Sequence, residues 1–308
     1  MSEQPDADSL KELLARSTLA DSIRINFDGQ IASENDARAL CETTFAILKM
    51  GGSYLDLQGL DGVSIADDYL AALHGVERGF GERLAPTPTS DGFGIGLAMT
   101  LPVQRSGTMK SHIVLDSRLG RPLIDPDGAG YDFAVHTLMH EAAHAHDLQI
   151  QYRCVPGFYG SPIKSFCERT LVELTLGAWD EYIASRLSAP WGTPKYVPSF
   201  EVELIVMLAS VRQRGNGAVT EYNEHHEIVT TATKMVSIYG SLLVRASYIL
   251  GHADGIGTDL AVQAPRWSQL VESTPWFSPY WTQYCAVLCC ARCIRATENG
   301  AASQSSIR

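Results

Sequence analysis

The residues with the clearest chemistry lie in the stretch TLMHEAAHAHD, residues 137–147, which contains HEAAH from His140 to His144. On a helix, side chains four positions apart share one face with Cβ atoms about 5–6 Å apart, so the two histidines can bind one metal ion. Glu141 projects beside that pair, where a carboxylate can hold a water molecule next to the ion. The spacing therefore predicts a metal site with Glu141 as general base. The alternative is a histidine-bearing helix that matches the motif by accident.

A catalytic zinc ion also needs a third protein ligand and an open position for water. Cys154 and Cys167 are not spaced as a thiolate pair, and His144 is not followed by the glycine and histidine of the metzincin extension. A carboxylate on another helix remains, and Glu181 in the helical stretch GAWDEYIASRLS supplies one. Two histidines and a glutamate suit Zn²⁺ better than Mg²⁺ or Ca²⁺. We therefore expect one zinc ion per chain on His140, His144 and Glu181.

An HExxH helix followed by a helical glutamate resembles the gluzincin branch of zinc metallopeptidases. The stretch DEYIAS, residues 180–185, is similar to the N-E-x-x-A/S pattern around the ligand glutamate of that branch. Within that branch the chain resembles the compact cytosolic ImmA/IrrE-like peptidases, and the resemblance covers roughly residues 110–188. Within it, KSHIVLD, residues 110–116, is placed like the edge strand that such enzymes use to hold a substrate backbone by strand addition.

The chain departs from the family pattern at two points. Thermolysin-type enzymes carry an aspartate four positions after the ligand glutamate, where this chain has Ser185. The distal side chain that stabilises the oxyanion has no clear counterpart here. The candidates for that role are His225, His226 and Tyr182.

Glu173 is the rival third ligand, because it lies on the same predicted helix as Glu181. The two residues are eight positions apart, which turns a helix by about 80° and shifts the side chains by about 12 Å. We therefore do not expect both to reach one ion. The small residues that follow Glu181 favour it over Glu173.

The predicted site would hydrolyse a bond with metal-activated water. A zinc-bound water has a pKa of ~7 and is a usable nucleophile at neutral pH. Glu141 would take the proton of that water and deliver it to the leaving amine, as base and then as acid. A structural zinc site has no need of Glu141, so its presence favours an enzyme.

Three further polar residues of the same helix lie close to the motif in sequence. Asp147 shares the face of His140 and His144 and would orient a ligand imidazole, or it is a charge near the end of the helix. His136 extends the stripe by one turn and either lines the site or is packed. His146 points to another face and is not expected to be a ligand.

Apolar periodicity and turn residues predict a mixed first half followed by helices. Helices are predicted over residues 8–16, 33–49 (with Ser33 as cap), 65–78, 131–149, 166–187, 199–214, 221–250 and near 281–295. Strands are predicted over residues 22–27, 53–58, 94–103 and 110–116, the last two joined as a hairpin by RSGT.

These elements predict an α+β fold. The resemblance implies a zincin-like core, in which a small antiparallel sheet carries an active-site helix, followed by a mainly helical C-terminal region. We expect an N-terminal α/β region over residues 1–90, the catalytic core over 91–190, and a helical region over 191–308 that forms one compact unit with the core. The Pro- and Gly-rich stretch 81–94 is the best linker or loop candidate.

Composition limits the partners. The 308 residues are 45% hydrophobic and 19% charged, with a formal charge of −11 and a pI near 5.2. An acidic chain is not expected to bind nucleic acid or an anionic membrane as its main partner. The expected partner is a peptide or protein substrate, and the oligomeric state stays open.

Cysteine usage and the N-terminal sequence both predict a cytoplasmic protein. The first residues are polar and acidic, unlike a secretory signal, and no apolar run reaches the roughly 18 residues of a membrane helix. The seven cysteines are an odd number, which does not suit a disulfide framework. Cys285, Cys289 and Cys293 recur every four positions, which favours helix packing over a second zinc site.

Three functions therefore remain from the sequence. The first is a zinc metallopeptidase of gluzincin type. The second is a zinc hydrolase that acts on a non-peptide substrate. The third is a non-enzymatic interaction or regulatory protein that a zinc ion stabilises.

Overall fold

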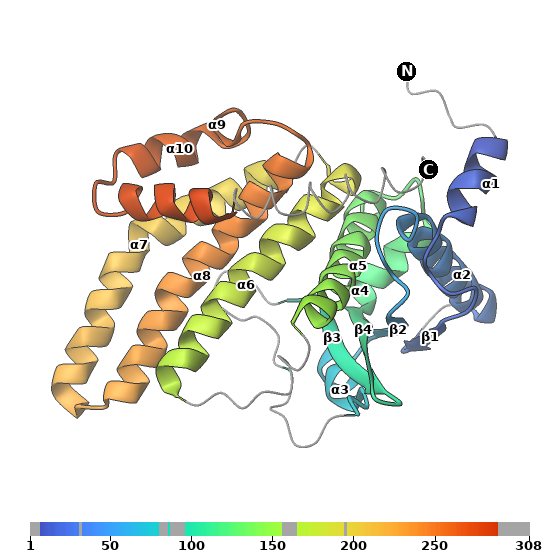
Figure 1. Ribbon diagram of the computed structural model, residues 1–308, viewed down its shortest axis with the longest axis horizontal. Helices are drawn as coiled ribbons and strands as arrows, with labels where there is room; N and C mark the ends of the chain where they lie inside the picture. The colour runs from blue at the N-terminus through green and yellow to red at the C-terminus, as the bar shows by residue number, and fades with distance from the viewer. Residues whose placement is uncertain are drawn as a thin grey trace. The chain divides into compact units, whose positions relative to one another are not determined.

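A computed structural model describes residues 7–30, 33–79, 86, 96–155, 165–193 and 196–288 of the chain (Figure 1). Its fold is α+β, as predicted, because a four-stranded sheet occurs together with many helices. Contacts within the chain divide it into two compact units. The first comprises Met1–Leu171 and Ile183–Pro194, and the second comprises Val172–Tyr182 and Lys195–Arg308.

The first unit contains one mixed sheet with the strand order β1-β2-β4-β3. β1 (Arg24–Asp28), β2 (Leu60–Ala66) and β4 (Thr108–Asp116) run parallel, whereas β3 (Ala98–Arg105) pairs antiparallel with β4. The prediction of an antiparallel sheet is therefore wrong for two of the three strand pairings, β1 with β2 and β2 with β4, and right for β3 with β4. The crossover from β1 to β2 contains α2 (Glu34–Gly51), and a crossover through a helix returns the chain in the parallel direction.

The strand at the edge of the sheet beside β4 is β3. We expected KSHIVLD, which lies within β4, to be the edge strand, but β4 pairs with β2 on one side and with β3 on the other. Its residues 111–116 are all buried, as is usual for a strand covered on both faces. The interior position of β4 corrects the prediction and leaves β3 with one partner strand in the part of the chain that the structure describes.

β3 and β4 form the predicted hairpin. Arg105 pairs with Thr108, so the loop consists of Ser106 and Gly107. Their φ angles are 50° and 80°, and positive φ at both central residues is typical of a type I′ turn, whose twist matches that of the two strands. Gly107 adopts this conformation without the steric penalty of a Cβ atom.

The segment around β2 differs from the prediction. Residues 53–58 consist of turns, a bend and irregular backbone where we expected a strand, and β2 begins only at Leu60. The helix expected over residues 65–78 is limited to α3 (Tyr69–Gly75), whose first turn is capped by the Asp68 carboxylate, a hydrogen-bond acceptor for the Ala71 N–H. β2 is buried on both faces, so its sequence lacks the alternation that marks a half-exposed strand.

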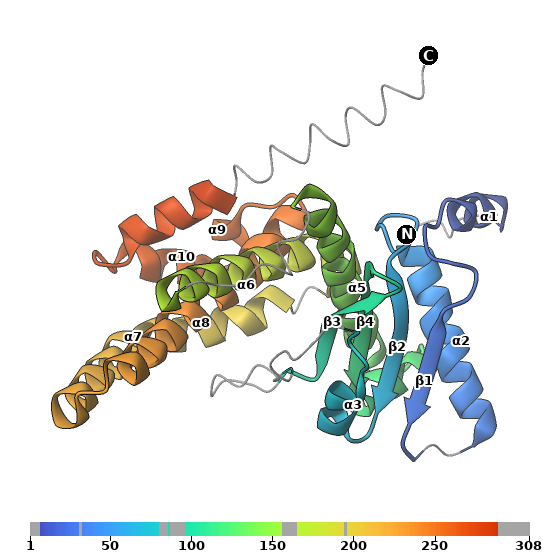
Figure 2. The same cartoon turned by 60° about the horizontal axis from the view of Figure 1, so that its bottom comes forward.

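Helices pack on the sheet, and one of them is α5 (Tyr131–Cys154), which carries the motif (Figure 2). Leu138 and Met139 of α5 belong to one buried cluster with Ile113 of β4 and Leu48 of α2. Val114, the next residue of β4, belongs to the cluster that α3 covers. Successive side chains of a strand point to opposite faces, so α5 and α3 lie on different faces of the sheet.

The first unit contains further helical segments. They are α1 (Ala7–Ala15), α4 (Ser117–Gly120), the 3₁₀ turns η1 (Arg121–Ile124) and η3 (Ala189–Trp191), and residues 166–171 and 183–188 of α6 (Phe166–Ser188). Ser33 caps α2 as predicted, because its hydroxyl accepts a hydrogen bond from the Asp36 N–H. Such a cap satisfies one of the free N–H groups at a helix start.

The second unit is helical, as predicted for the C-terminal region. Its elements are residues 172–182 of α6, α7 (Tyr196–His225), α8 (Ile228–Gly255), α9 (Leu260–Gln263), α10 (Pro265–Glu272) and the helical residues 278–288. α7 continues through Gly215 and Gly217, where the sequence predicted a break. A Cβ atom at Gly215 would lie 3.0 Å from the Tyr239 hydroxyl of α8, so glycine permits the close approach of these two helices.

Some sequence expectations concern residues that the structure describes only in part. The linker candidate, residues 81–94, lies outside the described residues except for Pro86, and so do Cys289 and Cys293. Cys285 is half-buried. Among the described residues, no helix is both long enough and apolar enough to cross a membrane.

Candidate metal centre

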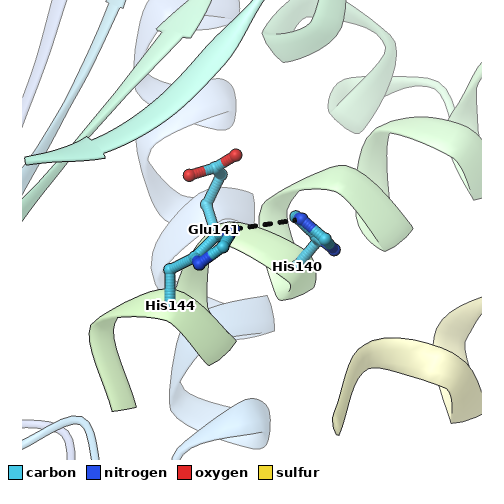
Figure 3. A group of neighbouring side chains, drawn as sticks. All are labelled: His140, Glu141 and His144. Atoms are coloured by element: carbon cyan, nitrogen blue, oxygen red, sulfur yellow. Dashed lines mark hydrogen bonds between the residues drawn. The ribbon is translucent and has the colours of Figure 1, made fainter. Parts of the chain in front are cut away.

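α5 brings His140, Glu141 and His144 together as the sequence predicts (Figure 3). One ligand atom from each side chain lies within 4.8 Å of the others, and this group has the geometry to hold a metal ion. His140 and Glu141 are 7% and 6% exposed, and His144 is half-buried. The helix α5 therefore positions all three side chains, two of which are buried.

The two imidazoles have the spacing of a chelating pair. The Nε2 atoms of His140 and His144 are 3.2 Å apart, and the rings meet edge to face at 84°. Two zinc–nitrogen bonds of about 2.0–2.1 Å that meet near the tetrahedral angle place their nitrogens about 3.3 Å apart. The separation of the two nitrogens therefore suits one tetrahedral ion.

The carboxylate of Glu141 is held by β3. The Thr100 hydroxyl lies 2.7 Å from Oε2 of Glu141 and 2.8 Å from its backbone carbonyl oxygen. A threonine hydroxyl has one proton, so the two acceptors share it. This contact joins the predicted general base to the edge strand. Thr100 could not be identified from the sequence, because one threonine in a strand carries no signal of its own.

Burial and neighbouring charge keep a nearby tyrosine neutral. Burial raises the pKa of Tyr69 in α3, and the carboxylates of Glu141 and Asp116 raise it further. The phenol oxygen is buried without a hydrogen-bond partner among the described residues. Tyr69 therefore adds no negative charge near Glu141 at physiological pH.

The neighbouring residues of α5 fall outside the ligand group. His146 accepts a 2.7 Å hydrogen bond at Nδ1 from the Asp56 N–H, so its ring faces away from the motif as predicted. His136 is buried, with its ring centre 6.4 Å from that of His140 and its Nε2 atom 3.4 Å from the Ser188 hydroxyl. It is a packed histidine.

Asp147 is 1% exposed and is therefore no surface charge. Its carboxylate accepts a 2.6 Å hydrogen bond from the Gln151 side chain. A role for Asp147 in orienting a ligand imidazole stays a prediction.

Glu181 lies in the second unit, so its assignment as third ligand stays a prediction. Its carboxylate accepts a hydrogen bond from the Tyr248 hydroxyl. Burial, and then the charge of Glu181, raises the pKa of Tyr248 far above its usual range. Tyr248 was not identified from the sequence, since its relation to Glu181 depends on the packing of α8 against α6. The side chain of the rival Glu173 lies outside the described residues.

The three candidates for oxyanion stabilisation also belong to the second unit. The Tyr182 hydroxyl donates a 2.5 Å hydrogen bond to Asp254. His225 and His226 are exposed at the end of α7. Their assignment to the site stays a prediction.

No protein-family model matches this chain, and no curated protein or solved structure is significantly similar to it.

Proposed function

We propose that this chain is a zinc-dependent metallopeptidase of gluzincin type that hydrolyses a peptide bond in a peptide or protein. The observation that carries the proposal is the 3.2 Å separation of the Nε2 atoms of His140 and His144, which suits two nitrogens on one tetrahedral zinc. Glu141 adds the carboxylate that hydrolysis needs and that a purely structural ion does not. Glu181 is the proposed third ligand.

Zinc, when bound, supplies a charge that polarises a carbonyl group and lowers the pKa of water towards ~7. The protein supplies proton transfer. Glu141 accepts a proton from the attacking water on its carboxylate and then gives it to the leaving amine. The buried position of Glu141 and its bond to Thr100 limit the rotation of that carboxylate, which favours transfer along one direction.

An extended polypeptide is the substrate class that suits this site. β3 is an edge strand among the described residues, and Thr100 joins it to Glu141. A peptide that adds to a sheet edge is held by main-chain hydrogen bonds, independent of most of its side chains. The substrate-holding role that the resemblance implied for residues 110–116 is therefore proposed for β3.

Metal content tests the site. Wild type, His140→Ala, His144→Ala and Glu141→Gln would each be incubated with zinc, desalted and analysed by inductively coupled plasma mass spectrometry. We expect one zinc per chain in wild type and in Glu141→Gln, and little in the two histidine variants. A wild type without stoichiometric zinc would mean that the motif is accidental, and the proposal would be wrong.

Peptide cleavage tests the reaction. The zinc-loaded protein would be incubated with a peptide mixture from a digested proteome, and new termini would be identified by mass spectrometry. We expect termini that wild type produces and Glu141→Gln does not. Zinc binding without any such termini would instead favour a non-peptide substrate or a zinc-stabilised interaction protein.

A further inference from the structure

Thr100 is placed where the edge strand meets the predicted general base. Its hydroxyl contacts both the carboxylate and the backbone carbonyl of Glu141, a residue 41 positions away in sequence. Glu141 is 6% exposed as a whole residue, so it counts among the buried charged residues. A buried carboxylate needs hydrogen-bond donors, and Thr100 provides one from outside the helix.

The backbone of Thr100 faces the outer edge of the sheet. Pro102 has no N–H, so its antiparallel pair with Ser111 cannot exchange both backbone hydrogen bonds. Such pairs alternate along a strand, so the backbone groups of Thr100 and Gln104 also point away from β4. Gln104 confirms this direction, because its N–H donates a 2.7 Å bond to the Arg78 carbonyl.

The side chain of Thr100 faces α5. Met99 and Leu101 pack with α3 on the opposite face of the sheet, and alternate residues of a strand point to opposite faces. Thr100 therefore presents its backbone to the outer edge and its hydroxyl to Glu141. Arg78 already bonds the outward backbone groups of Pro102 and Gln104, so a substrate strand would pair at Thr100, which would align it with the base.

We propose that Thr100 is a positioning residue for Glu141. Its hydroxyl holds Oε2 and leaves Oε1 to exchange the proton with water and the leaving amine. The inference rests on the proposed function, because it takes Glu141 as the general base. A merely structural Thr100 would dock β3 onto α5 through the carbonyl bond and would have no effect on the carboxylate.

The experiment compares Thr100→Val, which keeps the shape but loses the hydroxyl, with Thr100→Ser, which keeps the donor. Thr137→Val is the matched control, because the hydrogen bond that the Thr137 hydroxyl donates to the Phe133 carbonyl of the same helix, at 2.8 Å, is exposed. The zinc content of each variant and the urea concentration at its unfolding midpoint would show whether it keeps its metal and its fold.

The kinetic readout is the split between kcat and KM on the peptide that wild type cleaves fastest. A misplaced catalytic group lowers the rate by up to about 100-fold, so we expect Thr100→Val to lower kcat by about 10- to 100-fold with KM nearly unchanged. Thr100→Ser should restore kcat to within about threefold, and Thr137→Val should match wild type. A Thr100→Val enzyme with normal kcat, or a serine variant no better than valine, would overturn the proposal.

A second readout does not depend on activity. Crystal structures of the zinc-loaded variants would show whether the Glu141 carboxylate keeps one position. We expect one position in wild type and Thr100→Ser, and a rotated or divided carboxylate in Thr100→Val. The same single position in Thr100→Val would overturn the positioning role. If zinc binds but no peptide is cleaved, the proposed peptidase function fails, and these structures still decide whether Thr100 positions Glu141.

Discussion

His146 bonds the backbone N–H of Asp56 through its Nδ1 atom at 2.7 Å, although it lies only two positions after the candidate ligand His144. The two histidines therefore have different roles on one helix: His144 belongs to the candidate metal site, and His146 bonds the backbone of the segment that precedes β2. This difference provides an internal control for the metal assignment.

We predict that His146→Ala binds zinc like wild type, whereas His144→Ala does not. The loss of the Asp56 bond should lower the free energy of unfolding by about 1–2 kcal/mol, because the partner N–H is left without its acceptor. Zinc content by mass spectrometry and urea unfolding of the two variants would check this. Equal zinc loss in both would mean that general damage to α5, and not loss of a ligand, explains the His144 result.

Tyr248→Phe should weaken zinc binding if Glu181 is the third ligand. The Tyr248 hydroxyl donates to the Glu181 carboxylate, and loss of such a partner usually weakens metal affinity by about 10- to 100-fold. Competition with a chromophoric chelator would give the zinc dissociation constants of Tyr248→Phe and Glu181→Ala. Tyr280→Phe is the control, because Tyr280 is 66% exposed.

Glu181→Ala should weaken zinc binding more than Tyr248→Phe does. Unchanged affinity in Glu181→Ala would remove this residue from the ligand set, and Glu173→Ala would then be measured in the same assay. Unchanged affinity in Tyr248→Phe alone would leave Glu181 as ligand and assign its orientation to other contacts.

The free energy of unfolding should fall at acidic pH because of His252. His252 is 4% exposed and stacks on Tyr196, and burial lowers its pKa from 6.5 to about 4. Above pH 6.5 both the folded and unfolded forms are neutral; between 6.5 and about 4 the unfolded form binds a proton that the folded form does not. Stability from this residue is therefore lost as pH falls through that window, by about 2 kcal/mol between pH 7 and 5.

The variant His252→Phe isolates this effect, because it keeps a ring against Tyr196 and cannot titrate. Urea unfolding of both proteins at about pH 7 and 5 would measure it. We expect the free energy of unfolding of wild type, relative to His252→Phe, to fall by about 2 kcal/mol on acidification. A constant difference between the two proteins would show that His252 has an ordinary pKa.

Glu201→Ala should destabilise the second unit. Glu201 is 4% exposed, and its carboxylate accepts hydrogen bonds from the backbone N–H groups of Arg266 and Trp267 and from the Arg266 guanidinium. Loss of the helix cap and of the buried acceptor should cost about 2–4 kcal/mol. The exposed Glu221, which pairs with Lys234, is the control, because Glu221→Ala should cost less than about 1 kcal/mol.

Urea unfolding followed by circular dichroism would compare the two glutamate variants. An equal, small effect would mean that the N-terminus of α10 finds another acceptor when Glu201 is absent.

Prediction from sequence succeeded where neighbours along the chain decide the structure. The HEAAH spacing and the absence of Pro and Gly placed the three motif residues on one helix, and the RSGT turn joined the last two strands. It was wrong for β2, whose two buried faces hide its period, and for the edge position, which it assigned to residues 110–116. Strand order depends on which elements pack together, and local propensity contains no information about that.

By itself, then, the sequence determined the chemistry that α5 can offer, because residues four positions apart on a helix share a face whatever surrounds them. The tertiary structure decided which strand lies beside the motif residues of α5. It placed β3 at the edge, with the Thr100 hydroxyl 2.7 Å from Oε2 of Glu141. Contacts between residues 41 positions apart arise only when sheet and helix pack, since burial of both apolar clusters selects one arrangement of the strands.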